Sequence, residues 1–377
     1  MALTERNEAI DVTRGLAMLL VIYGHTLEMF FMPFMRIDHA FDFLAFEIYR
    51  LIYSFHMPAF YFISGMTATN LTARPFRKIL ATAFTLIILA DLVHLLGVCP
   101  YIYMKLHDGA PIIEIVRTVI RPIVAGWDFS IVVLWFLVSL AIVQILAWLL
   151  VHSNLAGKVL IWVVAVAVFL LSHYDNKLYF QAQSWAVGMV FFMAGWGAMR
   201  YDRFAKGQPR GLLLLYGCLI LAALFFSYPL NRGCLFDSTT TCSTAAGTKF
   251  FLVHLLYGRI GFVPLFFFTA FAGTGALVFI ALTIRETRVA SAIAWVGRNT
   301  LGLLILNGFV LRIEGTLAKR IPINPLGVPT AVWSVLFVAA QLAVFPIFKP
   351  LLTKLHEWSR HLSDLLLVRF EPSPPVK

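Results

Sequence analysis

Two ionisable residues at the start of the first apolar segment have a spacing that favours a shared chemical role. Arg14 stands where the segment begins, and His25 follows eleven positions later. In an α-helix, eleven steps turn the chain by about 1100°, roughly 20° beyond three full turns, over a rise of about 16 Å. Arg14 and His25 are therefore expected on one helix face. An ionisable residue inside a membrane helix is energetically costly, which marks it as a candidate functional residue.

Further polar residues are predicted at the depth of His25 in a membrane. The helical rise places His25 and Asp91 about 18 Å from the cytoplasmic ends of their segments, while His56 lies about 9 Å below the outer surface. The residues expected in this layer are His25, Glu28, His56, Asp91, His94 and Arg259. Imidazole suits proton transfer near neutral pH, and a nearby carboxylate fixes its tautomer. The layer is therefore a candidate for acid–base chemistry.

A second group of cations, Arg74, Arg77 and Lys78, opens the third apolar segment. Arginine binds phosphate groups in a bidentate manner. Together with Arg14, these residues are expected to hold a phosphorylated cytosolic ligand.

A purely structural role is also possible for each of these residues. Cations in a short loop act as topology determinants, and Arg14 could snorkel at a helix end. His56 could be a satisfied core histidine, and Asp91 could form a hydrogen-bonded pair with His94. The role of His254 and Arg259 could be purely structural, namely to tie helices together.

The elements that must position these residues are membrane helices. Of 377 residues, 60% are hydrophobic and only 13% are charged, whereas soluble domains carry about 25% charged residues. Ten apolar segments are long enough to span a bilayer. Their expected ranges are 13–34, 48–69, 79–99, 130–151, 155–172, 184–200, 211–229, 250–283, 289–310 and 328–350. We therefore predict an all-α, polytopic membrane protein with a single domain over 1–355. The connection at 100–129 is expected to form an amphipathic or re-entrant segment on the outer face.

The net charge of +11 is concentrated in short loops and at the C-terminal end. Basic residues cluster after even-numbered segments, so the positive-inside rule places both termini, including a tail at 356–377, in the cytoplasm. No nucleic-acid motif is present, and the partner expected around the helices is membrane lipid. Cys234 and Cys242 then lie in an outer loop, where a disulfide is plausible only in an oxidising compartment. No cysteine or histidine spacing resembles a metal site.

Several segments resemble the acyltransferase 3 family. The run Ala9–Gly15 through Gly24-His25 is similar to the family's opening, with its Arg-x10-His signature. Tyr53–Gly65 resembles the family's second-helix segment, and Arg74–Arg77 resembles the Arg-x-x-Arg motif that follows it in the family. Leu134–Leu137 resembles a further family segment. The likeness covers most of the chain and is nearest to the branch often described as fucose 4-O-acetylase-like. A late segment, Val296–Asn307, departs from the family pattern, because Leu304 and Asn307 replace a common Tyr and His.

The resemblance implies a membrane-embedded O-acyltransferase in a bacterial cytoplasmic (inner) membrane or a plasma membrane. Such an enzyme moves an acyl group, usually acetyl, from cytosolic acyl-CoA to a sugar hydroxyl of a glycan or glycolipid, with no permanently bound cofactor. The residues fit this task, because a hydroxyl is a poor nucleophile until a base takes its proton.

The roles expected from this resemblance fall on seven residues. His25 is the general base or, alternatively, a transient acyl carrier, and Arg14 positions the donor or the polar network below His25. Asp91 orients a histidine or binds the sugar, and His56 assists. The residues expected to contact the coenzyme A phosphates are Arg74, Arg77 and Lys78.

Two further classes of function also fit the polar layer. Buried His, Asp and Arg residues could form the proton relay of a secondary transporter for a sugar-like substrate, although no inverted repeat is visible. A membrane scaffold or sensor would instead need none of these residues for an activity.

Overall fold

The computed structural model describes residues 8–31, 43–172, 178–199, 210–231, 253–317 and 330–368. Within these ranges the regular structure is helical, apart from one bridge between His254 and Arg259. The prediction of an all-α protein is therefore confirmed.

The chain divides into two compact units. The first contains 1–69 and 190–346, and the second contains 70–189 and 347–377. The expectation of one domain over 1–355 stays a prediction.

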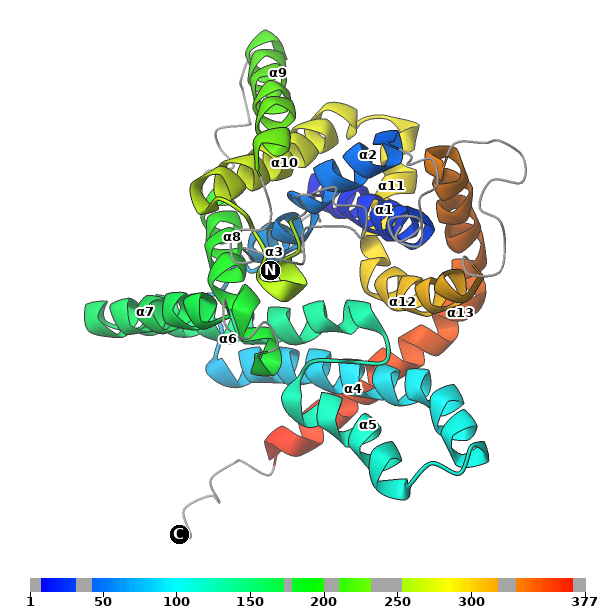
Figure 1. The fold of residues 1–377 in the computed structure, drawn as a ribbon. Coiled ribbons are helices and arrows are strands. Elements are labelled where there is room, and N and C mark those ends of the chain that lie inside the picture. The colour runs from blue at the N-terminus through cyan, green and yellow to red at the C-terminus, as the bar shows by residue number, and fades with distance from the viewer. Residues whose placement is uncertain are drawn as a thin grey trace. The chain divides into compact units, whose positions relative to one another are not determined.

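The first unit is built around α1 (Glu8–Phe31), which packs against five other helices (Figure 1). These are α2 (Phe43–Tyr53), α3 (His56–Thr67), α10 (Val263–Ile284), α11 (Arg288–Arg298) and α12 (Thr300–Leu317). The unit also holds α9 (Arg210–Ser227) and the short turns η5 (Tyr228–Leu230) and η6 (Leu255–Tyr257). Most of α8 (Trp185–Ala198) and the first half of α13 (Thr330–Val368) belong to it as well.

Small residues let α1 and α11 approach each other closely. A methyl group added at Gly15 would overlap the carbonyl oxygen of Ile293, and one added at Gly297 would overlap that of Asp11. Membrane helices commonly associate through such small residues, which bring the backbones together. This contact fixes the end of α1 that carries Arg14, while aromatic and aliphatic residues of α2 pack around the end that carries His25.

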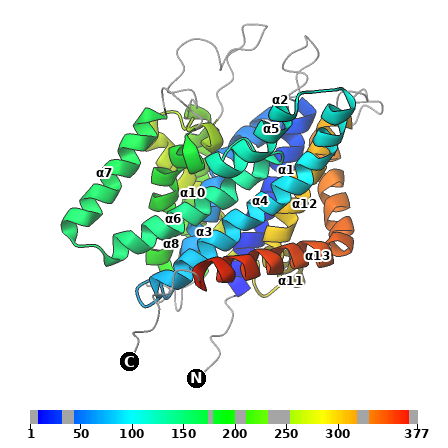
Figure 2. The same cartoon turned by 90° about the horizontal axis from the view of Figure 1, so that it is seen from below.

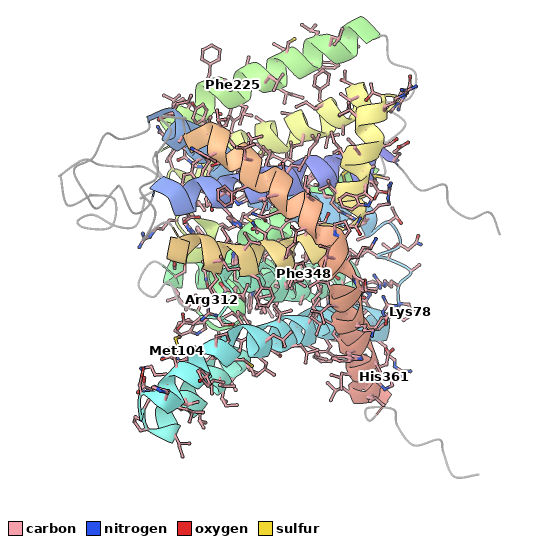
Figure 3. The ribbon with its side chains drawn as sticks, turned by 90° about the vertical axis from the view of Figure 1, so that its right-hand side faces the viewer. Lys78, Met104, Phe225, Arg312, Phe348 and His361 are labelled. Atoms are coloured by element: carbon pink, nitrogen blue, oxygen red, sulfur yellow. The ribbon has the colours of Figure 1, made fainter. Side chains whose placement is uncertain are left out.

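The second unit contains α4 (Phe76–His107), α5 (Ile112–Ala125), α6 (Trp135–His152) and α7 (Leu155–Leu171). α4 and α6 lie side by side, and α5 folds back next to α4 (Figure 2). Two 3₁₀ turns, η2 (Val132–Leu134) and η3 (Tyr179–Ser184), lead into α6 and α8. The end of α13 reaches the start of α4, where Ser363 Oγ donates to the carbonyl of Ala81 over 2.9 Å. Figure 3 shows Lys78 and His361 at this end of the unit.

The expected membrane spans are supported for about half of the segments. Five described helices are long and apolar enough to cross a membrane, namely α1, α4, α6 with its preceding turn η2, α10 and α13. Counting α11 and α12 as one span bent by 72° gives six. The other expected spans are shorter helices such as α7, or the pair α2 and α3, which is interrupted at Ser54 and Phe55. The count of ten and the positions of the termini therefore stay predictions.

One expected span has the wrong boundary. The pattern at 250–283 predicts one long segment that is kinked, tilted or partly interfacial because of Pro264 and the Gly273–Gly275 pair, with Arg259 about 13 Å inside it. The helix instead starts at Val263. Pro264 lies in its first turn, because proline has no backbone N–H and so cannot donate the hydrogen bond that a position in the helix interior requires. Gly258 and Gly261 before it have left-handed φ values of 67° and 73°. Arg259 therefore lies in a turn before α10.

Two other expectations concern the C-terminal tail and the loop that contains Cys234 and Cys242. α13 continues through residue 368, so the first half of the expected tail at 356–377 is helical, while its cytoplasmic location stays a prediction. Cys234 and Cys242 lie outside the described residues.

Candidate functional site

His25 belongs to a buried polar cluster in the first unit. Its Nδ1 lies 2.8 Å from Oδ1 of Asn307 on α12. Asn307 is fully buried and donates through Nδ2 to Oε1 of Gln341 on α13 over 3.0 Å. These two hydrogen bonds connect α1, α12 and α13, and they place the His25 side chain next to polar groups of the protein.

His56 is the second histidine of the cluster. Its ring lies edge-on to that of His25, with 6.4 Å between the centroids. Its Nδ1 lies 2.9 Å from the carbonyl oxygen of Ile52, which can only accept a hydrogen bond. Nδ1 of His56 therefore carries the proton, and Nε2 of the neutral ring is an acceptor. The structure brings His25 and His56 together, as expected for a shared layer.

Glu28, one turn after His25 on α1, extends the cluster. The hydroxyl of Tyr53 donates to the Glu28 carboxylate. The Tyr53 ring contacts His56, with 4.5 Å between ring centroids, and His25, with 6.3 Å. Tyr53 therefore links the mostly buried carboxylate of Glu28, whose side chain is 13% exposed, to both histidines.

His254 approaches Glu28 from the turn before α10, outside the membrane-spanning helices. Its Nε2 lies 4.0 Å from Oε1 of Glu28. Burial lowers the pKa of His254 to about 4, and the positive charges of Arg259 and protonated His25 contribute to that lowering. His254 is therefore neutral near pH 7, so its contact with Glu28 is not an ion pair.

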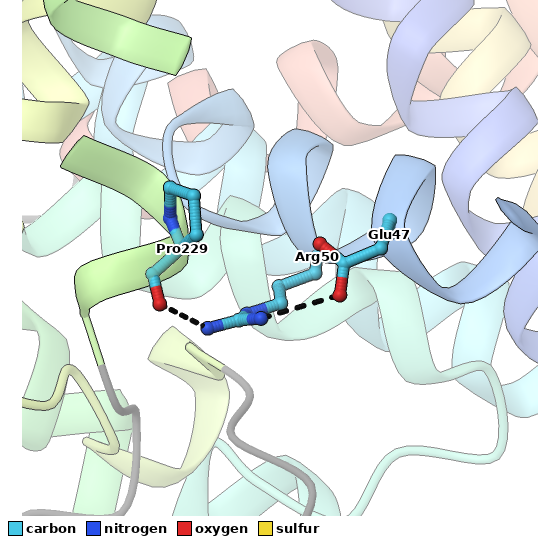
Figure 4. Close-up of polar contacts among 3 residues, drawn as sticks. All are labelled: Glu47, Arg50 and Pro229. Atoms are coloured by element: carbon cyan, nitrogen blue, oxygen red, sulfur yellow. Dashed lines mark hydrogen bonds and ion pairs between the residues drawn. The ribbon is translucent and has the colours of Figure 1, made fainter. Parts of the chain in front are cut away.

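Arg50 anchors the helix that carries Tyr53. Its guanidinium donates to Glu47 on α2 over 3.3 Å and to the carbonyl of Pro229 in η5 over 2.6 Å (Figure 4). Arg50 and Tyr53 are three positions apart on α2 and share a helix face. The contact with Pro229 thus helps to fix the helix that orients Tyr53.

Arg14 lies on α1, which is one continuous helix from Glu8 to Phe31. The expected helix between Arg14 and His25 is therefore confirmed, and with it their common face. Arg14 is half-buried, next to the close contact of α1 with α11.

Asp91 and His94 belong to the second unit. His94 Nδ1 accepts from the backbone amide of Ser130 over 2.9 Å, and Nε2 lies 3.2 Å from the carbonyl of Val119. Oδ1 of Asp91 is buried and has no hydrogen-bond partner in the described part of the chain. The hydrogen bonds of the His94 ring thus tie together the segments around α4 and α5, and a catalytic role for Asp91 stays a prediction.

The cations expected to bind a donor also lie in the second unit. Arg74 precedes α4 and donates to Oγ1 of Thr82 over 2.8 Å, while its carbonyl accepts from Nε1 of Trp148. Arg77 and Lys78 lie in the first turn of α4, where no side chain caps the backbone amides. A helix N-terminus has a positive electrostatic potential, which these cations strengthen.

Sequence reasoning assigns no role to three residues of the cluster. Tyr53 stands out only as part of a family-like segment, and Asn307 only as a departure from the family pattern. Gln341 offers one available signal, because it is an amide within an otherwise apolar run.

The comparison with protein families matches the model of the acyltransferase domain to residues 7–349. This match covers every residue of the cluster and the cations of α4. No curated protein and no solved structure shows significant similarity to the chain.

Proposed function

Because this chain belongs to the acyltransferase 3 family, we propose that it moves an acetyl group from cytosolic acetyl-CoA to a sugar hydroxyl of a cell-surface or exported glycan. The family match and the apolar helices identify it as an integral membrane acyltransferase. The proposal adds the donor, the glycan or glycolipid acceptor and a bacterial inner membrane. It also places the chain in the fucose 4-O-acetylase-like branch. The family match does not favour a transporter.

The observation that carries this proposal is the hydrogen bond between His25 Nδ1 and Asn307. It leaves Nε2 of His25 to take the proton of a sugar hydroxyl. The hydroxyl oxygen then attacks the thioester carbonyl carbon, and the carbon–sulfur bond breaks. The departing coenzyme A thiolate takes the proton back from Nε2, which yields the ester and free coenzyme A. His25 is thus proposed as the general base, with no covalent acyl-histidine needed.

The other predicted residues have supporting roles in this proposal. His56, next to His25, assists proton transfer, and Arg14 positions the donor from the same face of α1. The proposed contacts for the coenzyme A phosphates are Arg74, Arg77 and Lys78. An uncapped helix N-terminus with adjacent cations is a favourable place for phosphate, which supports this assignment. Asp91 is proposed to contact the acceptor sugar.

The proposal predicts that His25→Ala and Arg14→Ala abolish glycan acetylation while the protein still inserts into the membrane. Mass spectrometry of surface glycans, compared with and without the gene, provides the measurement. His107→Ala is a matched control, because its side chain is 79% exposed at the end of α4. Normal acetylation by His25→Ala, at an equal level of membrane-inserted protein, would refute the role of His25.

A further inference from the structure

Asn307 and Gln341 form a chain of two hydrogen bonds that ends on His25. The chain runs from Oε1 of Gln341 to Nδ2 of Asn307 over 3.0 Å, and from Oδ1 of Asn307 to Nδ1 of His25 over 2.8 Å. Asn307 is 0% and Gln341 4% exposed. Exchange of these hydrogen bonds for bonds to bulk water is therefore hindered.

The chemistry of the amide groups determines the donor and the acceptor of each hydrogen bond between Gln341, Asn307 and His25. Nδ2 of Asn307 can only donate, and it is engaged by Oε1 of Gln341. The amide of Asn307 therefore presents its oxygen, which can only accept, to His25. Nδ1 of His25 must then carry the proton, which leaves Nε2 of the neutral ring unprotonated. Turning the Asn307 amide over would place its oxygen against the Gln341 oxygen, so Gln341 opposes that rotation.

We infer that Asn307 is a positioning residue that selects the tautomer of His25, and that Gln341 holds Asn307 in the required orientation. The catalytic meaning of this inference rests on the proposed function, in which Nε2 of His25 is the base. A carboxylate would hold the ring in the same tautomer and would also stabilise the protonated imidazole. The neutral amide supplies the orientation without that additional charge.

The tautomer can be measured without any activity by ¹⁵N NMR of the full-length protein labelled at histidine and reconstituted in lipid. A His25→Gln spectrum identifies the His25 signals among those of the ten histidines. We expect the neutral His25 ring to be protonated at Nδ1 in the unmodified protein and in Asn307→Asp, which keeps an accepting oxygen. Asn307→Leu, similar in shape but without polar atoms, should show a mixture of tautomers. An unchanged Nδ1-protonated ring in Asn307→Leu would overturn the inference.

Kinetics give a second readout. Asn307→Leu should lower kcat by about 10-fold to 1,000-fold and leave KM for acetyl-CoA nearly unchanged. Asn307→Asp should restore most of kcat and move the acidic limb of the pH–rate profile to higher pH, because the carboxylate stabilises the imidazolium. Equal kcat and pH profiles for all three proteins would contradict the inference. If Asn307→Leu does not fold, Gln341→Met tests the same point, because it frees the Asn307 amide to rotate.

The two proposals fail in different ways. If the tautomer responds as expected but the unmodified protein transfers no acyl group, the positioning role stands and the proposed function is wrong. If the unmodified protein transfers acyl groups and Asn307→Leu changes neither the tautomer nor kcat, the function stands and the positioning role is wrong.

Discussion

Glu28 and Tyr53 define the surroundings in which a substrate hydroxyl would meet His25. The Tyr53 hydroxyl is directed to the carboxylate, so it does not donate to either imidazole. His56 holds its own proton on Nδ1 through Ile52. The cluster thus supplies unprotonated imidazole nitrogens and a carboxylate, which are hydrogen-bond acceptors. Such a set favours a ligand rich in hydroxyl donors, as a sugar is.

The cations at the start of α4 give a prediction that separates binding from chemistry. Arg77→Ala and Lys78→Ala should raise KM for acetyl-CoA by about tenfold each, because each loses a charge-assisted hydrogen bond to phosphate. The value of kcat should change little. Steady-state kinetics with purified protein provide the measurement, and Lys158→Ala on α7 is a lysine control. An acetyl thioester that lacks phosphates should show no such loss, and an equal rise of KM for both donors would contradict the phosphate contacts.

The meeting of His25, His56 and Glu28 could be predicted because depth along a helix follows from residue counting. The partnership of His25 with Asn307 could not, since it joins positions 282 residues apart. It depends on how α12 is rotated against α1, and a single sequence carries little information on that rotation. Gln341 is a similar case, because an amide in an apolar run indicates a buried hydrogen bond but not its partner.

The interruption between α2 and α3 connects the shape of the helices with the site. Ser54 Oγ donates to the carbonyl of Leu51 over 2.6 Å, and His56 Nδ1 donates to that of Ile52 over 2.9 Å. These side chains add a second hydrogen bond to two carbonyls at the end of α2, which also accept from the backbone amides of Ser54 and Phe55 over 3.2 Å each. The break thereby fixes the His56 ring at the first position of α3. The apolar pattern at 48–69 predicts one continuous span and does not show this break. Within that pattern, Pro58 is the residue that is typical of a new helix start, and it lies in the first turn of α3.

Close packing of α8 on α3 provides a prediction about stability. A methyl group added at Gly195 would overlap the carbonyl oxygen of Phe62, whereas one added at Gly197 would meet no atom within 4 Å. Gly195→Ala should therefore destabilise the protein by about 1–3 kcal/mol, because the helices must separate. Gly197→Ala, on the same helix, should be neutral or slightly stabilising, since alanine favours a helix over glycine. Thermal unfolding of both variants in detergent measures the difference, and equal melting temperatures would contradict the close packing.

At the scale of the whole molecule, the membrane orientation decides whether the donor proposal is possible. The proposed donor, acyl-CoA, is cytosolic, so the proposal requires that Arg77 and Lys78 at the start of α4 face the cytoplasm. α4 is 32 residues long, or about 48 Å at the helical rise, which is enough to carry the chain across a bilayer. The turn at Gly109 after α4 should then lie on the outer side. The basic residues after the even-numbered apolar segments and at the C-terminal end predict that both termini lie in the cytoplasm.

Reporter fusions test this orientation directly. Fluorescent proteins that fold only in the cytoplasm should be active at either terminus, and alkaline phosphatase, which is active only outside, should be active when fused after Gly109. Thiol labelling provides a check without any fusion. A cysteine is introduced at Gly109, where an added side chain meets no atom within 4 Å, in a protein whose four native cysteines are replaced by serine. Labelling from the outside is expected. Labelling only from the cytoplasm would put the cations of α4 on the outer side, out of reach of acyl-CoA, and would exclude them as donor contacts even if His25 proved essential.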